Sequence, residues 1–270
     1  MIPARFEYVR EDSAEQALQL LAQHGEDARL LAGGQSLIPL MKLRLAMPSV
    51  LIDIGRIPEL RYIRLDGDEV AIGALARDHD LETSAMLRTE VPLLAYVAAQ
   101  VGDPQVRARG TIGGTLAHGD AASDLPTAVL ALGATMVIRG PGATRTVPAT
   151  EFFKKTFSTA IEPDEMLVEV RIPRLAGYGW GYQKFTRRAN DWPIVAVATV
   201  NGRVALANAA ETVIRARATD EAIAAGASIN DAAEVADREA TPTADMHGSI
   251  TYHRHLIRVL TERALHAAAG

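Results

Sequence analysis

The stretch LLAGGQSLIPLMKLR, residues 30–44, joins a short apolar run of strand character to a possible helix start through Gly33 and Gly34. Backbone that turns sharply and exposes consecutive N–H groups uses glycine, because no Cβ blocks the conformation or a ligand's close approach. A second stretch of this kind, RARGTIGGTLAHGDAASDLP at residues 107–126, contains Gly113 and Gly114. Two such turns suggest one elongated anionic ligand held at two places, such as a dinucleotide pyrophosphate.

The flanks of the two turns differ in chemistry. The first turn has no basic residue, so an anion would be held mainly by backbone dipoles, and Ser36 could cap the next helix or bond a phosphate oxygen. A plain strand-to-helix turn stays open here, because Gly-Gly often only marks a loop. In the second turn Thr111 and Thr115 add hydroxyls, exposed glycine amides are expected, and Asp124 could accept from a ribose or adenine donor. That combination favours a ligand. Neither turn matches a P-loop or Rossmann fingerprint.

The bulk composition sets the class of protein. The 270 residues suffice for one large domain or two modest ones, and the net charge of −5 argues against nucleic-acid binding. No apolar run approaches the roughly 20 residues of a membrane span, and no signal peptide is evident, so a cytoplasmic protein is expected. The chain has no cysteine. This excludes disulfides, thiolate zinc sites and Cys-ligated iron–sulfur clusters within it, so any redox role needs a non-thiol cofactor.

The order of expected elements predicts an α+β chain with three lobes. The first, about residues 1–57, has strand, helix, strand, glycine turn, helix and strand, with strands at 6–10, 29–32 and 50–54 and a helix after Ser13. The second, about 58–176, opens with a hairpin at Asp66-Gly67 and has helices at 79–87, 92–101 and from 124, and strands at 134–140 and 165–173. Beyond a glycine-rich stretch, 177–270 has antiparallel strands and then Ala-rich helices.

Two further polar groups can be interpreted either as ordinary surface or structural residues or as functional ones. Lys184 and Asp191 belong to a charged cluster beside Trp192. A solvated face is the default interpretation, while the functional one places a cation and an aromatic ring beside a flat cofactor. His118 with Asp120 is interpreted as structural or exposed rather than as an acid–base pair. No metal site is expected.

Taken together, these segments resemble a known family. LLAGGQSLIPLMKLRLAMPSVLIDI, GTIGGTLAHGDAASDLP, EMLVEVRIP and YQKFTRRANDW occur in the family's order, and the last twenty-odd residues resemble its closing helix. Over essentially its whole length the chain resembles the FAD-binding medium subunit of molybdenum hydroxylases, nearest to the aerobic carbon monoxide dehydrogenase type. The resemblance implies a two-lobed FAD-binding domain of the vanillyl-alcohol-oxidase/PCMH type at 1–176. It also implies a small α+β C-terminal domain of the carbon monoxide dehydrogenase flavoprotein type at 177–270.

The resemblance also implies which residues bind FAD. Two segments would bind the pyrophosphate region: Ala32, Gly33, Gly34, Gln35, Ser36 and Leu37, and Thr111, Gly113, Gly114 and Thr115. Asp124 would hold the adenosine or ribitol side, and Leu167 and Lys184 match positions near the flavin ring system. Asp191 and Trp192 lie where the family places residues beside the isoalloxazine. The family often has asparagine at position 115, and the nearest type has tyrosine at position 192. No catalytic base, nucleophile or metal ligand is implied.

As function, the resemblance implies the flavin subunit of a heterotrimeric hydroxylase, found as a dimer of heterotrimers. Substrate would be oxidised at a molybdenum cofactor in a large partner subunit. Electrons would pass through 2Fe–2S clusters of a small subunit to FAD in this chain and then to an external acceptor. The absence of cysteine agrees with this division. A self-contained flavin oxidoreductase of related fold and a non-enzymatic nucleotide-binding module remain as alternatives.

Overall fold

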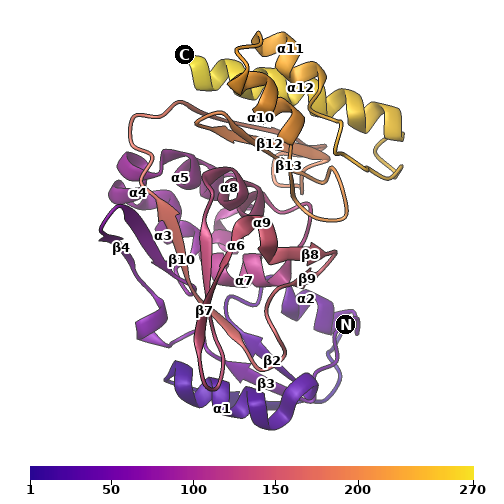
Figure 1. Cartoon of the computed structure of the whole chain (residues 1–270). Coiled ribbons are helices and arrows are strands. Elements are labelled where there is room, and N and C mark those ends of the chain that lie inside the picture. The colour runs from indigo at the N-terminus through magenta and orange to yellow at the C-terminus, as the bar shows by residue number, and fades with distance from the viewer.

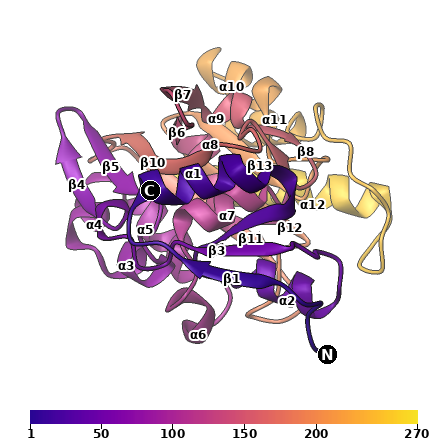
Figure 2. The ribbon, with the colours of Figure 1, turned by 90° about the horizontal axis from the view of Figure 1, so that it is seen from below.

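A computed structural model describes residues 1–270 of the chain (Figure 1). The N-terminal lobe is built on a small parallel sheet. Strand β3 (Val50–Asp53) lies between β1 (Glu7–Arg10) and β2 (Ala28–Leu31), and both pairings are parallel. Helix α1 (Ala14–His24) packs on this sheet (Figure 2), and begins where the Ser13 hydroxyl accepts from the backbone N–H of Gln16. The short α2 (Leu37–Lys42) follows the first glycine turn.

The middle lobe is built on a five-stranded antiparallel sheet with the order β4-β5-β10-β6-β7. The strands are β4 (Ile63–Asp66), β5 (Glu69–Gly73), β6 (Thr135–Arg139), β7 (Thr144–Pro148) and β10 (Met166–Pro173). The helices are α3 (Asp78–Thr83), α4 (Ala85–Glu90), α5 (Pro92–Ala99), α6 (Pro104–Arg107), α7 (Ile112–His118), α8 (Asp124–Leu132) and α9 (Ala149–Phe152). A small hairpin joins β8 (Phe153–Lys155) to β9 (Ser158–Thr159).

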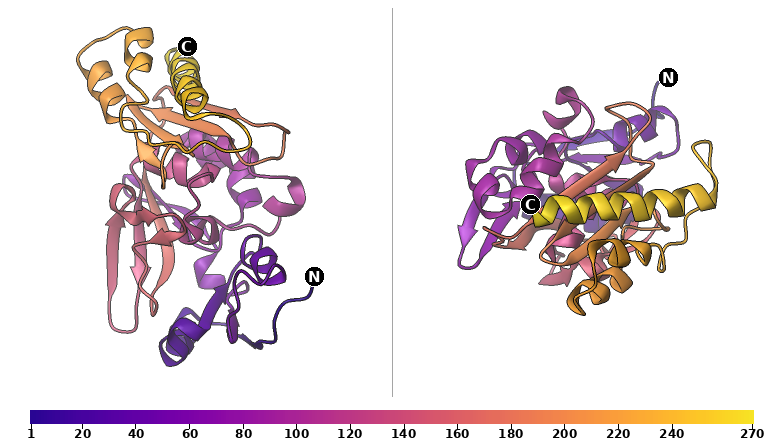
Figure 3. Two further views of the ribbon diagram at one scale, coloured as in Figure 1. Left: turned by 90° about the vertical axis from the view of Figure 1, so that its right-hand side faces the viewer. Right: turned by 90° about the horizontal axis from the view of Figure 1, so that it is seen from above.

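The C-terminal lobe is a four-stranded antiparallel sheet with three helices. Its strands are β11 (Trp180–Phe185), β12 (Val195–Val200), β13 (Arg203–Ala207) and β14 (Ile214–Arg215). Its helices are α10 (Arg217–Ala224), α11 (Ile229–Glu234) and the long α12 (Ile250–Ala269). Figure 3 shows α12 lying across the sheet. None of the helices of the chain is both long enough and apolar enough to span a membrane.

The sheet of the C-terminal lobe is covered on both faces, which fixes the lobe to the rest of the molecule. Every residue of β12 is buried. Ala196 and Ala198 join the core of the middle lobe, in contact with α8, whereas Val195 and Val197 join a separate core beneath α12. A strand buried on both faces has no polar alternation, which explains the continuous apolar run IVAVATV.

The predicted α+β class and the three lobes are confirmed, and most expected elements lie within a few residues of their predicted ends. The hairpin at Asp66-Gly67 is β4–β5, and the expected strand at 165–173 is β10, the central strand of its sheet. Several short elements were not predicted from the sequence. They are α6, β7, α9, β8, β9 and β14.

Candidate functional site

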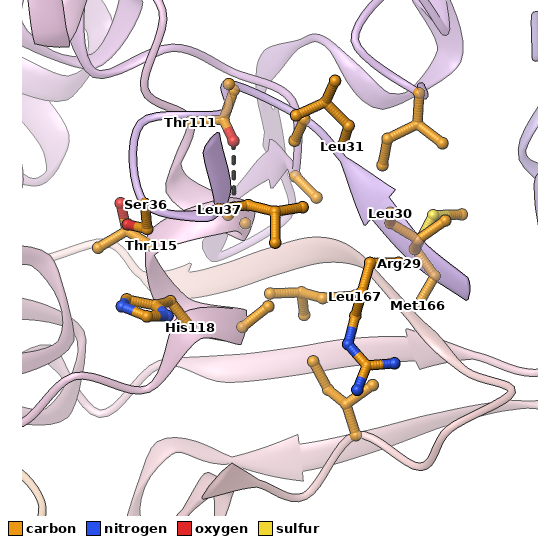
Figure 4. A pocket seen from close by; sticks show the side chains of 18 of the residues that line it. Arg29, Leu30, Leu31, Ser36, Leu37, Thr111, Thr115, His118, Met166 and Leu167 are labelled. Atoms are coloured by element: carbon orange, nitrogen blue, oxygen red, sulfur yellow. Dashed lines mark hydrogen bonds between the residues drawn. The ribbon is translucent and has the colours of Figure 1, made fainter. Parts of the chain in front are cut away.

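A cavity of about 560 Å³ lies between the N-terminal and middle lobes (Figure 4). Three parts of the chain line it: β2 with the first glycine turn, the second glycine turn with α7, and the segment 157–167 that ends in β10. Its volume is within the range of small-molecule and cofactor sites. The cavity is therefore the candidate site of the chain.

The two glycine turns touch each other and together form one wall of this cavity. A Cβ on Gly33 would lie 2.2 Å from the carbonyl oxygen of Arg109, just before the second turn. A Cβ on Gly113 would lie 2.6 Å from the carbonyl oxygen of Ala74. Gly34 has a φ of +75°, in the left-handed region that favours glycine. Gly33 and Gly113 are thus required by close backbone packing, and Gly34 by its conformation.

The first turn presents a row of unused backbone donors. The N–H groups of four consecutive residues, Gly33, Gly34, Gln35 and Ser36, donate no hydrogen bond within the chain. Ser36 is the N-cap of α2, but its hydroxyl makes no capping hydrogen bond, so of the two roles considered for it the cap is not seen, and the hydroxyl is free. Consecutive free N–H groups form a concavity that binds anions. This turn has the chemistry of a phosphate cradle.

The second turn is built differently, and the expectation that Gly113 and Gly114 expose free amides is wrong. The N–H of Gly113 donates to the carbonyl of Ala74 at 2.9 Å, and that of Gly114 donates to the Thr111 hydroxyl at 3.2 Å. The cause is that this turn is also the start of α7, with Thr111 as its N-cap. The turn offers side-chain hydroxyls instead, and Figure 4 shows Thr115 beside Ser36.

The far end of the cavity is mainly apolar. Leu30 and Leu31 from β2 and Met166 and Leu167 from β10 all line the cavity (Figure 4). Arg29 lies at the same end, and its guanidinium donates to the carbonyls of Glu26 and Ala28, at 2.9 and 2.7 Å. Such a wall suits a flat ring next to the anion cradle.

Sequence reasoning missed two parts of the lining. His118 was interpreted as structural or exposed, yet it lines the cavity and packs against Phe157 with ring centroids 4.9 Å apart. Burial lowers the pKa of His118, against a smaller opposing effect of Asp120. The sequence could have placed His118 at the site, because it lies one helical turn after Gly114 and therefore on the same face of the helix. The segment 157–165 reaches the cavity only through the β8–β9 hairpin, so no local pattern marked it.

Two family descriptions divide the chain between them. Residues 4–175 match the family described as the FAD binding domain in molybdopterin dehydrogenase. Residues 180–268 match the CO dehydrogenase flavoprotein C-terminal domain. The chain belongs to the FAD-binding subunits of the molybdopterin dehydrogenases. Its cofactor is FAD, and it is a subunit of an oxidoreductase. The two-lobed FAD-binding fold with a small C-terminal domain is thereby confirmed.

Relatives match over the full length of the chain. The carbon monoxide dehydrogenase medium chain of Hydrogenophaga pseudoflava is 43% identical, covering 99% of this chain and 98% of the relative. The 6-hydroxypseudooxynicotine dehydrogenase complex subunit alpha of Paenarthrobacter nicotinovorans is 38% identical, covering 98% and 95%. A solved structure of the Hydrogenophaga pseudoflava carbon monoxide dehydrogenase, lacking the Mo-pyranopterin moiety of its molybdenum cofactor, matches with a TM-score of 0.97 at 44% identity, covering 100% and 99%.

The cavity fits FAD by its chemistry. The free amides of the first turn suit the two phosphates, and the hydroxyls of Ser36, Thr111 and Thr115 add polar partners beside them. The apolar wall that includes Leu167 suits a ring. All six predicted residues of the first turn and the four of the second line the cavity: Ala32, Gly33, Gly34, Gln35, Ser36, Leu37, Thr111, Gly113, Gly114 and Thr115.

Asp124 and Lys184 lie together but outside the lining of this cavity. The ammonium of Lys184, on β11, lies 2.9 Å from a carboxylate oxygen of Asp124, at the start of α8, and also donates to the carbonyl of Gln100. The hydroxyl of Tyr182 donates to the other oxygen of Asp124. Burial raises the pKa of Asp124, and Lys184 and Tyr182 oppose this shift. The pair links the middle lobe to the C-terminal lobe.

Asp191 and Trp192 are on the loop between β11 and β12 and do not line the cavity either. Trp192 is 55% exposed. The structure therefore groups the predicted residues into three places: the cavity, the buried Asp124–Lys184 pair, and this loop.

Asp78 is a buried carboxyl directly behind the second turn. One of its oxygens lies 2.3 Å from where a Cβ on Gly110 would be, and the other has no hydrogen-bond partner. Burial raises the pKa of Asp78 to about 7, with Arg107 opposing the shift and the charge of Asp124 adding to it. Asp78 is thus a polar group with an unmet hydrogen bond beneath the wall of the cavity.

We expect Gly33→Ala to lower the free energy of unfolding by about 1–3 kcal/mol, because the added methyl must displace the Arg109 carbonyl. Chemical denaturation measures this. Gly142→Ala is the matched control, because its methyl would meet no atom within 4 Å. Equal unfolding midpoints for the two variants would contradict the contact between the turns.

Asp78→Asn should become more stable than the wild type as the pH rises. The pKa of Asp78 is about 7 in the folded protein and 3.8 as the reference for the unfolded chain. Folding therefore favours the protonated form of Asp78. The contribution of Asp78 to the free energy of unfolding is fully present below about pH 4 and is lost as the pH approaches 7. The asparagine stays neutral, so its advantage should grow by up to about 1.4 kcal/mol per pH unit in this window.

Thermal unfolding between pH 4 and 8 tests this expectation. Asp68→Asn, at an exposed position, is the control. If the melting temperatures of Asp78→Asn and the wild type changed in parallel with pH, this would contradict the claim that Asp78 is buried and ionises only near neutral pH.

Proposed function

We propose that this chain is the flavin subunit of a molybdenum hydroxylase complex. In this proposal FAD accepts electrons from 2Fe–2S clusters of a small partner subunit and passes them to an external acceptor. A large partner subunit carries the molybdenum cofactor and oxidises the substrate. The relatives support this, because they are named as a medium chain and as a subunit of a dehydrogenase complex. The proposed assembly is a dimer of heterotrimers in the cytoplasm.

The observation that carries the proposal is an FAD cavity in a chain that holds no cysteine and no nucleophile–base pair at the site. Bound FAD supplies the redox chemistry by taking up and releasing electrons. The ring of His118 packs on Phe157, and Asp120 accepts from the backbone N–H of Ala122. Neither is arranged to activate the other. The chain's own residues bind and orient the cofactor.

We assign the pyrophosphate to the first glycine turn, because its four N–H groups are free. Leu167 is the proposed ring contact from β10. Asp124 and Lys184 are proposed to approach the ribitol and flavin from the buried side, and Asp191 and Trp192 from the β11–β12 loop. In the same proposal the FAD-binding domain is residues 1–176, and 177–270 form the C-terminal domain that carries Lys184 and this loop.

The substrate is proposed to lie on the large subunit. The two relatives are named for carbon monoxide and for 6-hydroxypseudooxynicotine, which differ greatly in size and chemistry. Both match this chain over almost its whole length at 43% and 38% identity. One architecture therefore serves different substrates, as expected if this subunit contacts only the cofactor and its partners.

Ser36→Asp should reduce FAD affinity at least tenfold, because the carboxylate would lie among the free N–H groups and compete with the pyrophosphate. Ser36→Asn is the matched control: both side chains are good N-caps for α2, so they differ mainly in charge. Flavin absorbance per mole of purified protein is the measurement. Equal flavin content in both variants would contradict the assignment of the pyrophosphate to this turn.

The complex itself tests the role of the subunit. Purified with its partners, the wild type should contain stoichiometric flavin, iron and molybdenum, and substrate should bleach the flavin only when all subunits are present. Bleaching of the flavin by substrate in the isolated chain would favour a self-contained oxidoreductase. Nucleotide binding without flavin absorbance would favour a non-enzymatic module.

A further inference from the structure

An apolar and basic surface lies on the outer side of the segment that follows the first glycine turn. Leu43, Leu45 and Met47 are 52%, 73% and 66% exposed, and Ile38 is 37% exposed. Lys42 and Arg44 lie among them and are exposed. These six residues, at and just after α2, are called the α2 surface below. Large apolar side chains gathered in one exposed segment indicate a binding surface.

The backbone of this segment is fixed, so the apolar side chains are presented in defined positions. The N–H of Leu43 donates to Pro39 at 3.0 Å, and that of Leu45 donates to Leu40 at 2.9 Å. Arg44 has a φ of +60°, a left-handed conformation that costs free energy for a residue with a Cβ. A strained turn that keeps Leu43 and Leu45 in water is unfavourable for the isolated chain. A partner that covers them offsets that cost.

The same segment is also a wall of the FAD cavity. Leu37, Leu40 and Ala46 line the cavity, while their neighbours Ile38 and Leu45 are exposed to solvent and do not line it. A helix with its side chains is about 10–12 Å across. Anything seated on the α2 surface is therefore separated from the cofactor site by little more than one helix.

The charge of this region is opposite to that of the whole chain. Residues 28–52 contain Arg29, Lys42 and Arg44 and no acidic residue, while the chain as a whole has a net charge of −5. Neither Lys42 nor Arg44 takes part in any of the chain's ion pairs. A complementary partner face would be apolar with carboxylates around it.

We propose that the α2 surface is where the small 2Fe–2S subunit docks, through an apolar face flanked by carboxylates. This inference rests on the proposed function, in which electrons pass from a cluster on that subunit to the FAD. The position directly behind the cavity wall gives the cluster a short path to the cofactor. A second copy of this chain is a poor occupant, because a two-fold interface would bring the same basic surface, with Lys42 and Arg44, together from both copies and no carboxylate to pair with them.

Leu45→Asp tests the docking surface in the complex, with all three subunits co-expressed. The variant should keep its flavin, because Leu45 is on the outside, and it should bind the small subunit at least tenfold more weakly. Iron and flavin content and the subunits recovered after size-exclusion chromatography are the measurements. Met246→Asp is the matched control, because Met246 is an 88% exposed methionine in the C-terminal lobe.

Lys42→Glu is a second variant, which tests the contribution of the positive charge to docking. It stays informative even if Leu45→Asp fails to fold. It should also weaken binding of the small subunit, and added salt should weaken the wild-type association, because screening reduces the attraction between exposed charges. Flavin retention shows that each variant is folded.

Three outcomes would overturn the inference: normal small-subunit content in Leu45→Asp and Lys42→Glu, loss of the large subunit while the small one stays, or a dimer of the isolated chain that Leu45→Asp dissociates. These outcomes differ from failure of the proposed function. That failure would show in the wild-type complex as missing flavin or missing iron.

Discussion

The contact between Gly33 and the backbone at Arg109 is the constraint on which the site depends. Two segments far apart in sequence approach so closely that a Cβ at position 33 would lie 2.2 Å from the Arg109 carbonyl oxygen. This contact joins the parallel sheet of the N-terminal lobe to the antiparallel sheet of the middle lobe. The cavity lies beside this contact, and its apolar end is lined by residues of β2 and β10. The two lobes also share a hydrophobic core, which contains Ile52 of β3 and Met166 and Val168 of β10.

Attachment of the C-terminal lobe has a different physical basis. The sheet of that lobe shares one face with α8 and covers the other with α12, so hydrophobic burial holds it in place. Within this junction Asp124, Lys184 and Tyr182 form a closed polar cluster. A buried ion pair of this kind contributes little net stability, because desolvation offsets the attraction, but removing one partner leaves an uncompensated charge. Its effect is to fix the relative position of α8 and β11.

Much of the fold was predictable because its signals are local. Ser13 caps α1, Asp66-Gly67 turns the first hairpin, and the alternating sequence VEVRI marks β10. The predicted glycine turns do line one cavity. What the sequence could not show is which donors remain free once the chain has folded. Gly113 and Gly114, like Gly33 and Gly34, form a glycine pair at a possible helix start, yet their N–H groups donate to Ala74 and Thr111. The 157–165 segment reaches the cavity only through a contact between residues far apart in sequence, in which the N–H of Phe157 donates to the carbonyl of Gly119.

The two turns therefore differ in how they tolerate change over evolution. In the proposed site the first turn binds the pyrophosphate through main-chain N–H groups, which every residue except proline carries, so exposed Gln35 is expected to vary freely as long as the path of the chain is kept. Truncating its side chains one at a time would leave recognition nearly intact and would make the loop look unimportant. The second turn faces the cavity with hydroxyls, so its identity at Thr111 and Thr115 carries chemical information. A search for relatives by side-chain identity alone would thus underrate a loop whose hydrogen-bond donors belong mainly to the main chain.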